Sequence, residues 1–160
     1  MKDRFLKEIN KHQGIIHKIV SVYTRDPEDK QDLFQEILLQ LWKAYPGFQN
    51  RAAFSTWMYR VALNTALLSD RRKKIEKKAG EQMKRELDLH NDQDADERLL
   101  HLYAAINQLH SLDKAITLLY LEQKSYEEIA LFLSINKNTV GVRISRIKEK
   151  LKKLLDDGKS

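Results

Sequence analysis

The sequence predicts an all-α protein of two small helical domains joined by a charged linker. Glycine and proline, which break helices, account for only five and two of the 160 residues. Apolar residues recur at spacings of three and four, the period of an amphipathic helix. Because 42% of the residues are hydrophobic, each domain has enough apolar side chains for a buried core. We expect the first domain at 1–74, the linker at 75–97 and the second domain at 98–156.

The composition argues against several classes of protein. The chain has no cysteine, so it has neither disulfide bonds nor thiolate metal sites, which fits a reducing, cytoplasmic location. No apolar run approaches the roughly 18 residues of a membrane span, and no signal-peptide pattern follows the first residues. The five histidines lack metal-site spacing, and no glycine-rich phosphate loop is present. We therefore expect no catalytic residue, no metal site, no cofactor and no membrane insertion.

The net charge of +6 is distributed unevenly along the chain. Acidic residues gather in 26–36 and 86–97, whereas basic residues gather in 71–78 and 137–153. One kind of partner cannot suit all four segments, so we expect more than one partner. The two basic segments favour a polyanion such as nucleic acid.

The first domain is expected to begin with a helix over about 5–23 and a second helix over about 27–45. The second helix has a strong start signal, since Asp26 suits the N-cap and Pro27 suits the first helical position. Pro46 and the glycine after it should end this helix. The buried face of the first helix is expected to contain Ile9, Ile16, Ile19 and Val20.

The second helix carries a second stripe besides its core face. Its members lie at i, i+3, i+7 and i+10, and they are Asp32, Gln35, Leu39 and Trp42. An exposed apolar edge beside acidic residues suits docking onto another protein. The alternative is that this face packs against the first helix.

The third helix, expected from about Ser55 to the mid-70s, divides into a core face and a polar stripe. The predicted core face consists of Phe54, Met58, Val61, Ala62, Thr65 and Leu68. The adjacent stripe consists of Trp57, Arg60, Asn64 and Arg71. An aromatic ring can stack on a base, an amide can bond a base edge, and guanidinium groups can pair with phosphates. The stripe thus suits a nucleic-acid strand; alternatively Trp57 is a boundary aromatic and the basic end only complements the helix dipole.

The second domain is expected to contain four helices, at about 96–108, 112–122, 126–133 and 137–155. The last two form a helix-turn-helix pattern with a basic final helix. Its core stripe is Val140, Ile144, Ile147 and Leu151, and its opposite face is Lys137, Asn138, Arg143, Ser145 and Arg146. A helical hairpin with a solvated basic face is the alternative.

Local signals define the turn of this motif. Ser125 can cap the helix expected at 126–133, with Glu128 three residues later as in a capping box. The turn itself is expected at 134–136. Many such turns have glycine where this chain has Ser134, so either Ser134 adopts a positive φ or the turn differs locally.

Two stretches resemble a known family. The combination of DLFQEILLQLWKAYPGF and AAFSTWMYRVALNTALLSDRRKK resembles the second region of the extracytoplasmic-function (ECF) group of sigma-70 factors. The stretch INQLHSLDKAITLLYLEQKSYEEIALFLSINKNTVGVRISRIKEKLKKLL resembles their fourth region. Together these stretches cover roughly 100 of the 160 residues, in the order of the family.

The resemblance implies a factor that directs RNA polymerase core to promoters and binds −35 duplex and melted −10 DNA. Polymerase binding, at the clamp helices of the largest subunit, would involve Asp32, Gln35, Glu36, Leu39 and Trp42. The −10 strand would contact Phe54, Ser55, Thr56, Trp57, Tyr59, Arg60, Asn64, Arg71, Arg72 and Lys73, with 47–56 forming a pocket for a flipped base. The −35 duplex would contact Lys137, Asn138, Thr139, Gly141, Val142, Arg143, Ser145 and Arg146. An anti-sigma factor is a further implied partner.

Two other functions remain open. A free-standing helix-turn-helix regulator would bind duplex DNA as a dimer without polymerase, but it leaves the stripe of Asp32, Gln35 and Trp42 unexplained. A helical interaction protein that mimics a sigma surface would make no DNA contact. Raising the salt concentration would therefore not weaken its binding.

Overall fold

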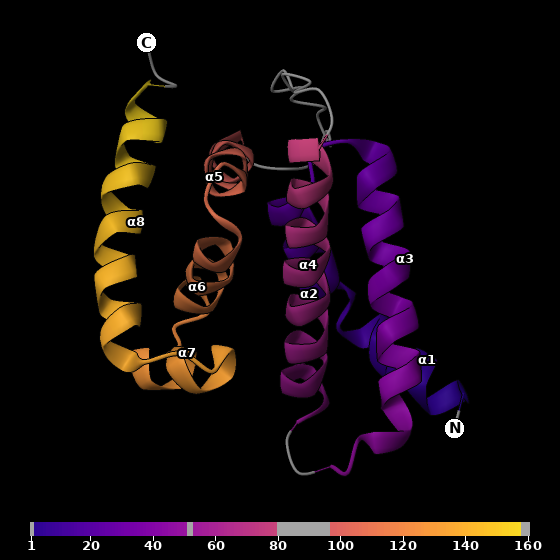
Figure 1. The fold of residues 1–160 in the computed structure, drawn as a ribbon. Coiled ribbons are helices and arrows are strands. Elements are labelled where there is room, and N and C mark those ends of the chain that lie inside the picture. The colour runs from indigo at the N-terminus through magenta and orange to yellow at the C-terminus, as the bar shows by residue number, and fades with distance from the viewer. Residues whose placement is uncertain (1, 51–52, 80–96, 158–160) are drawn as a thin grey trace. The chain divides into compact units, whose positions relative to one another are not determined.

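The structure is a computed structural model that describes residues 2–50, 53–79 and 97–157. The chain divides into two compact units, Met1–Lys84 and Arg85–Ser160. All regular elements in the described ranges are helices (Figure 1), which confirms the all-α prediction.

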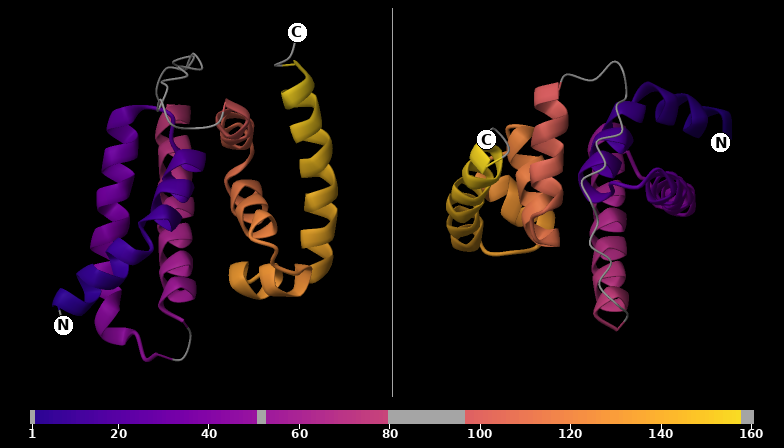
Figure 2. Two further views of the ribbon diagram at one scale, coloured as in Figure 1. Left: turned by 180° about the vertical axis from the view of Figure 1, so that it is seen from behind. Right: turned by 90° about the horizontal axis from the view of Figure 1, so that it is seen from above.

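The first unit is built around an antiparallel pair of long helices. These are α3 (Pro27–Ala44) and α4 (Phe54–Ala79), and the short 3-10 helix η1 (Tyr45–Gly47) follows α3 directly. Figures 1 and 2 show α3 and α4 side by side, and α2 (Gln13–Tyr23) packs against both. The N-cap prediction for α3 is confirmed, because the Asp26 carboxylate accepts a hydrogen bond from the backbone N–H of Glu28 at 3.0 Å.

The single first helix predicted over 5–23 is wrong, because the structure has α1 (Lys2–Lys11) and α2 as separate helices. The break lies at His12, whose φ of −120° and ψ of 21° are not helical. Gly14 lies two residues later, and glycine disfavours a continuous helix. The predicted buried face is confirmed on both sides of the break, at Ile9, Ile16, Ile19 and Val20.

The core face predicted for α4 is correct in part. Met58, Ala62 and Thr65 are buried, but Leu68 is 58% exposed and does not belong to the core. Because α4 packs against both α2 and α3, its buried side is rotated toward Leu63 and Ala66, which are both fully buried. Leu68 therefore lies on the outer face of α4.

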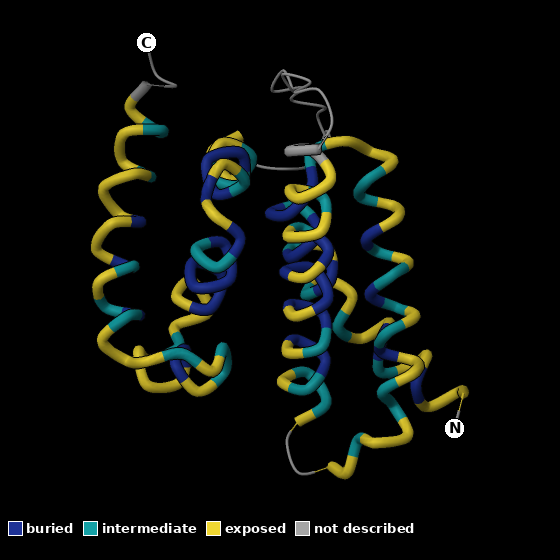
Figure 3. The backbone as a smooth tube through the Cα atoms, viewed as in Figure 1, coloured by how far each residue is buried: buried dark blue, intermediate teal, exposed yellow. Residues whose placement is uncertain are grey.

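The second unit contains four helices at nearly the predicted positions. They are α5 (Glu97–Asn107), α6 (Ser111–Leu121), α7 (Tyr126–Leu133) and α8 (Lys137–Asp157). Figure 3 shows buried residues along most of α6, the helix against which the unit is built. On α8, the predicted core stripe is buried at Val140, Ile144 and Ile147, whereas Leu151 is half-buried.

Most of the predicted linker, residues 80–96, lies outside the described residues. Helix α4 extends to Ala79 and so includes the beginning of this segment. The division at 74 and 98 stays a prediction.

The turn between α7 and α8 contains a residue in the left-handed conformation. Ser134 has φ 57° and ψ 45°, and the backbone N–H of Ile135 donates to the carbonyl of Ala130 at 3.0 Å. Of the two alternatives for this turn, the structure has the one in which Ser134 adopts a positive φ. A side chain in this conformation is strained because Cβ approaches the following carbonyl oxygen.

We expect Ser134→Gly to raise the free energy of unfolding by up to about 1 kcal/mol, because glycine has no Cβ to strain. Chemical denaturation of the full chain, followed at the transition of the second unit, measures this change. Ser134→Ala is the control, since alanine keeps Cβ and should give no gain. A gain of equal size in both variants would assign the effect to the hydroxyl group rather than to the backbone.

Candidate nucleic-acid and protein interfaces

A cluster of aromatic rings lies where α3 ends and α4 begins. The ring of Trp57 is 5.0 Å from Phe48 and 5.3 Å from Phe54, measured between centroids. Tyr45 lies 6.2 Å from the same indole ring. Trp57 is only half-buried in this cluster, so its orientation is fixed while part of its ring stays accessible.

The polar stripe predicted on α4 lies on one exposed face. Arg60, Asn64 and Arg71 are all exposed, and Leu68 lies among them. At 1.5 Å per residue, the distance from Trp57 to Arg71 along the helix is about 20 Å. The face presents an aromatic ring, an amide and two guanidinium groups in a row.

The other predicted −10 residues differ in accessibility. Thr56 is exposed, Phe54 and Ser55 are half-buried, and Tyr59 is only 8% exposed. Tyr59 points to the buried side of α4, which limits the surface that it offers to a ligand. Residues 51 and 52 of the predicted base pocket lie outside the described residues.

The basic end of α4 is paired with acidic side chains of α3. Arg72 donates to Glu36 at 2.7 Å, and Lys73 lies 3.4 Å from Asp29. These pairs are partly solvated, so each contributes little to stability, but each reduces the local positive charge. Arg72 and Lys73 are thus less available to phosphates than their sequence suggests.

The stripe predicted on α3 is accessible. Asp32 and Gln35 are exposed, and Leu39 and Trp42 are 50% and 44% exposed. The alternative that this face packs on the N-terminal helix holds for Trp42, whose ring lies 5.0 Å from that of Phe5. Leu39 and Trp42 also line a surface hollow of about 390 Å³ together with residues of α1.

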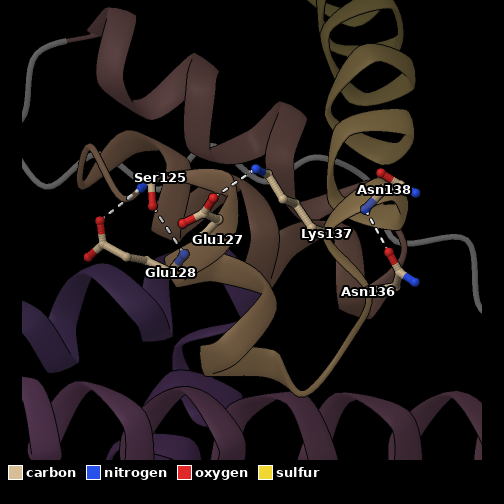
Figure 4. Close-up of polar contacts among 6 residues, drawn as sticks. All are labelled: Ser125, Glu127, Glu128, Asn136, Lys137 and Asn138. Atoms are coloured by element: carbon tan, nitrogen blue, oxygen red, sulfur yellow. Dashed lines mark hydrogen bonds and ion pairs between the residues drawn. The ribbon is translucent and has the colours of Figure 1, made fainter.

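A reciprocal capping box begins α7 and confirms the predicted start of this helix. The backbone N–H of Glu128 donates to Ser125 Oγ at 3.1 Å, and the backbone N–H of Ser125 donates to Glu128 Oε1 at 3.2 Å (Figure 4). The backbone hydrogen bond and the hydroxyl of Ser125 lower the pKa of Glu128 below its ordinary value.

The start of α8 is fixed by two side chains. The Asn136 side-chain oxygen accepts a hydrogen bond from the backbone N–H of Asn138 at 2.8 Å, and Lys137 Nζ pairs with Glu127 at 2.9 Å (Figure 4). The bond to Lys137 lowers the pKa of Glu127. The turn of the motif is therefore closed on the α7 side by the backbone hydrogen bond from Ile135 to Ala130 and on the α8 side by the side-chain oxygen of Asn136.

The structure brings five of the predicted −35 residues together around one surface hollow of about 420 Å³. They are Asn138, Thr139, Val142, Arg143 and Arg146. The predicted residues outside this hollow are Lys137, Gly141 and Ser145. A Cβ added at Gly141 would lie 3.6 Å from the ring of Tyr126, so this position faces α7.

The hollow also contains Asp113 of α6, which sequence reasoning missed. Its Oδ1 accepts a hydrogen bond from Arg143 Nη1 at 2.9 Å. Thirty residues separate the two in sequence, so helical periodicity could not have paired them. The sequence shows Asp113 only as an acidic residue near the start of a helix. Acidic residues are common there, so the position gave no sign of a partner on another helix.

Neither a metal site nor a membrane span emerges from the described ranges. No group of three or more His, Cys, Asp or Glu side chains there could hold a metal ion. Among the same residues, no helix is long and apolar enough to cross a membrane.

Comparison with known proteins gives two family matches. Residues 9–74 match Sigma-70 region 2, and residues 99–151 match Sigma-70, region 4. RNA polymerase sigma-H factor of Pseudomonas aeruginosa is 30% identical, over 87% of this chain and 81% of that protein. ECF RNA polymerase sigma-E factor of Escherichia coli is 32% identical, over 83% of this chain and 78% of that protein.

The fold also has a solved relative. The sigma factor RpoE of Bartonella quintana, in its complex with the anti-sigma factor NepR, superposes with a TM-score of 0.76 over 98% of both chains, at 22% identity.

We expect acid to destabilise α7 through Glu128. Because its pKa is lowered in the folded state, its stabilising contribution is present above the ordinary glutamate pKa and lost as the pH falls through the folded-state value. The thermal stability of Glu128→Gln should therefore depend less on pH in this acidic range, since glutamine keeps the acceptor but does not titrate. Circular dichroism melts across that range measure the difference; parallel curves would contradict the assignment.

Proposed function

This chain belongs to the ECF group of the sigma-70 family. We propose that α3 binds the polymerase, α4 binds the melted −10 strand and α8 binds the −35 duplex. The chain is a transcription initiation factor, not an enzyme: it directs RNA polymerase to promoters and carries the domains that bind −10 and −35 elements. The proposal concerns which residues make each contact.

The exposed stripe of α3 is the proposed polymerase contact. Asp32, Gln35 and Glu36 present polar and acidic groups beside the accessible apolar edge of Leu39 and Trp42. An apolar centre with a polar rim is typical of a protein interface. The proposed partner surface is the pair of clamp helices on the largest polymerase subunit.

The exposed face of α4 is the proposed contact for the melted −10 strand. Trp57 offers part of its ring for stacking, and Asn64 offers an amide for a base edge. Arg60 and Arg71 lie on the same face and supply charge for the phosphates. Arg72 and Lys73 add to this charge when their pairs with α3 open.

The first turns of α8 are the proposed contact for the −35 duplex. A helix fits the major groove, where base edges are distinguishable. Asn138 and Arg146 carry hydrogen-bonding groups, and Val142, which is 52% exposed, can contact a thymine methyl group.

Melting without ATP follows from differential affinity. A protein that binds the unpaired strand better than the paired strand shifts the equilibrium toward the bubble. Extruding one base costs a few kcal/mol, while one stacking contact returns about 1–3 kcal/mol. One stacking site therefore cannot melt a promoter alone, so polymerase contacts must contribute and the isolated chain should bind promoters weakly.

The family also suggests a location and a further partner. RpoE of Bartonella quintana is solved in complex with an anti-sigma factor, which supports the proposal that such a partner covers these surfaces. The proposed location is the cytoplasm, where sigma factors of this kind act on RNA polymerase, and the absence of cysteine fits that compartment.

The observation that carries the proposal is that exposed Arg60, Asn64 and Arg71 share one face of α4 with the half-buried ring of Trp57. In vitro run-off transcription with sigma-free core polymerase tests it. We expect RNA with a defined 5′ end when this chain is added and only unselective initiation without it. If adding this chain produced no start-site selectivity on any bacterial promoter library, the proposal would be wrong.

We expect Asn64→Ala and Trp57→Ala each to lower open-complex formation about 5- to 150-fold, because a base contact or a stacking contact contributes about 1–3 kcal/mol. Polymerase binding should be unchanged, since both side chains lie on α4. Permanganate footprinting measures the melted thymines, and co-purification measures polymerase binding. Asn64→Ala is the cleaner variant because Trp57 also belongs to the aromatic cluster.

The matched control is the double variant Asp32→Ala, Gln35→Ala. Both positions are exposed on α3, so the fold should persist while polymerase binding is lost. Normal promoter melting by the Asn64 variant, or normal polymerase binding by the double variant, would show that the corresponding stripe is wrongly assigned.

A further inference from the structure

We propose that Asp113 is a positioning residue that sets the −35 sequence preference of α8 through Arg143. The proposal rests on the proposed −35 function of α8 and adds a residue from a different helix to it. Asp113 would not touch DNA; it would hold the Arg143 side chain in one orientation and reduce its general attraction to phosphates.

The geometry supports a fixed arginine. Arg143 Nη1 and Asp113 Oδ1 are 2.9 Å apart, and their side chains are only 34% and 23% exposed. Both line the hollow that also contains Asn138, Thr139 and Arg146. The pair thus lies within the proposed DNA-reading surface.

A second pair in the same unit provides a comparison. Lys137 and Glu127 are also 2.9 Å apart, but their side chains are 57% and 70% exposed. Exposed pairs are screened by water and salt and contribute little. The Arg143–Asp113 pair is the more enclosed of the two, so water and salt screen it less.

The guanidinium group of Arg143 can bond Asp113 through one N–H group and still have other N–H donors for DNA. Arginine has five N–H donors in a rigid fork, of which this bond uses one. A held side chain loses less rotamer freedom when it meets a base edge. The pair therefore favours one contact geometry over many.

The carboxylate also changes the balance between specific and general binding. General binding follows the number of phosphates that basic groups neutralise. Asp113 offsets one positive charge at the reading surface, which weakens binding to every sequence. The loss is smaller where Arg143 meets its preferred base, so the ratio of specific to general affinity rises.

The location of Asp113 fits this role structurally. It is the third residue of α6, in the first turn, where a negative side chain stabilises the helix. Residues around it are buried, including Ser111 and Ala115 at 1% and 0% exposure. The carboxylate is therefore held by a rigid part of the unit.

The test uses holoenzyme reconstituted from core polymerase and the full chain. The wild-type holoenzyme first selects its preferred −35 sequence from a duplex library randomised in that region. Affinities of each variant are then measured for the selected promoter and for a promoter with a scrambled −35 region. The readout is the ratio of the two affinities, at two salt concentrations.

We expect Asp113→Asn to lower this ratio about fivefold or more, mainly through tighter binding to the scrambled promoter and a steeper salt dependence. Glu127→Gln is the matched control because it also removes one acid that pairs with a basic residue of α8. It should raise both affinities by a similar factor and leave the ratio unchanged. Thermal melts check that both near-isosteric variants fold.

Arg143→Ala separates a positioning role from direct contact. In that background, Asp113→Asn should no longer change the ratio, because its target is gone. A change that persists would mean that Asp113 acts on DNA itself, and the proposal would be overturned. An unchanged ratio in Asp113→Asn alone, or a change matched by Glu127→Gln, would overturn it as well.

The failure of the underlying function has a different signature. If wild-type holoenzyme selected no −35 sequence at all, the proposed role of α8 would fail, and the role of Asp113 with it. If the wild type selects a sequence and Asp113→Asn selects the same one equally well, the inference about Asp113 alone is wrong.

Discussion

The contacts of the Tyr45 ring join α1 to the start of α4 in the first unit of this protein. Its centroid lies 5.1 Å from Phe5, 6.2 Å from Trp57 and 6.4 Å from both Phe48 and Phe54. These rings come from α1, from the segment 45–48 that directly follows α3, and from the start of α4, so one cluster links α1, the end of the α3 segment and α4. The proposed polymerase stripe and the proposed strand-binding stripe therefore keep a constant relation within the unit.

Acidic side chains accompany the basic residues that the sequence assigned to DNA. Glu36 and Asp29 pair with the end of α4, while Asp113 and Glu127 pair with α8. Each pair lowers the number of free positive charges and hence the general attraction to phosphates. This arrangement fits a factor that finds its promoter as part of a polymerase complex, in which several weak contacts act together.

The exposed faces of α4 and α8 were predicted in part. Local periodicity placed Arg60 and Asn64 correctly on the outer face of α4, because neighbours on a helix face follow from spacing alone. The assignment of residues to DNA or to polymerase came from the family resemblance. Periodicity could not find Asp113, since its contact with Arg143 depends on how α6 packs against α8, thirty residues apart.

The sequence by itself determined the helical class and most of the helix boundaries in the second unit. Those boundaries follow from short-range signals, such as the reciprocal bonds of Ser125 and Glu128, that act within one turn. Tertiary packing decided the rest: the exposure of Leu68, the contact between Asp113 and Arg143, and which of its two alternatives the turn at Ser134 adopts. The physical reason is that these features depend on residues distant in the chain. Those residues decide which side of a helix is buried when it packs against two others, and how much backbone strain the packing can offset.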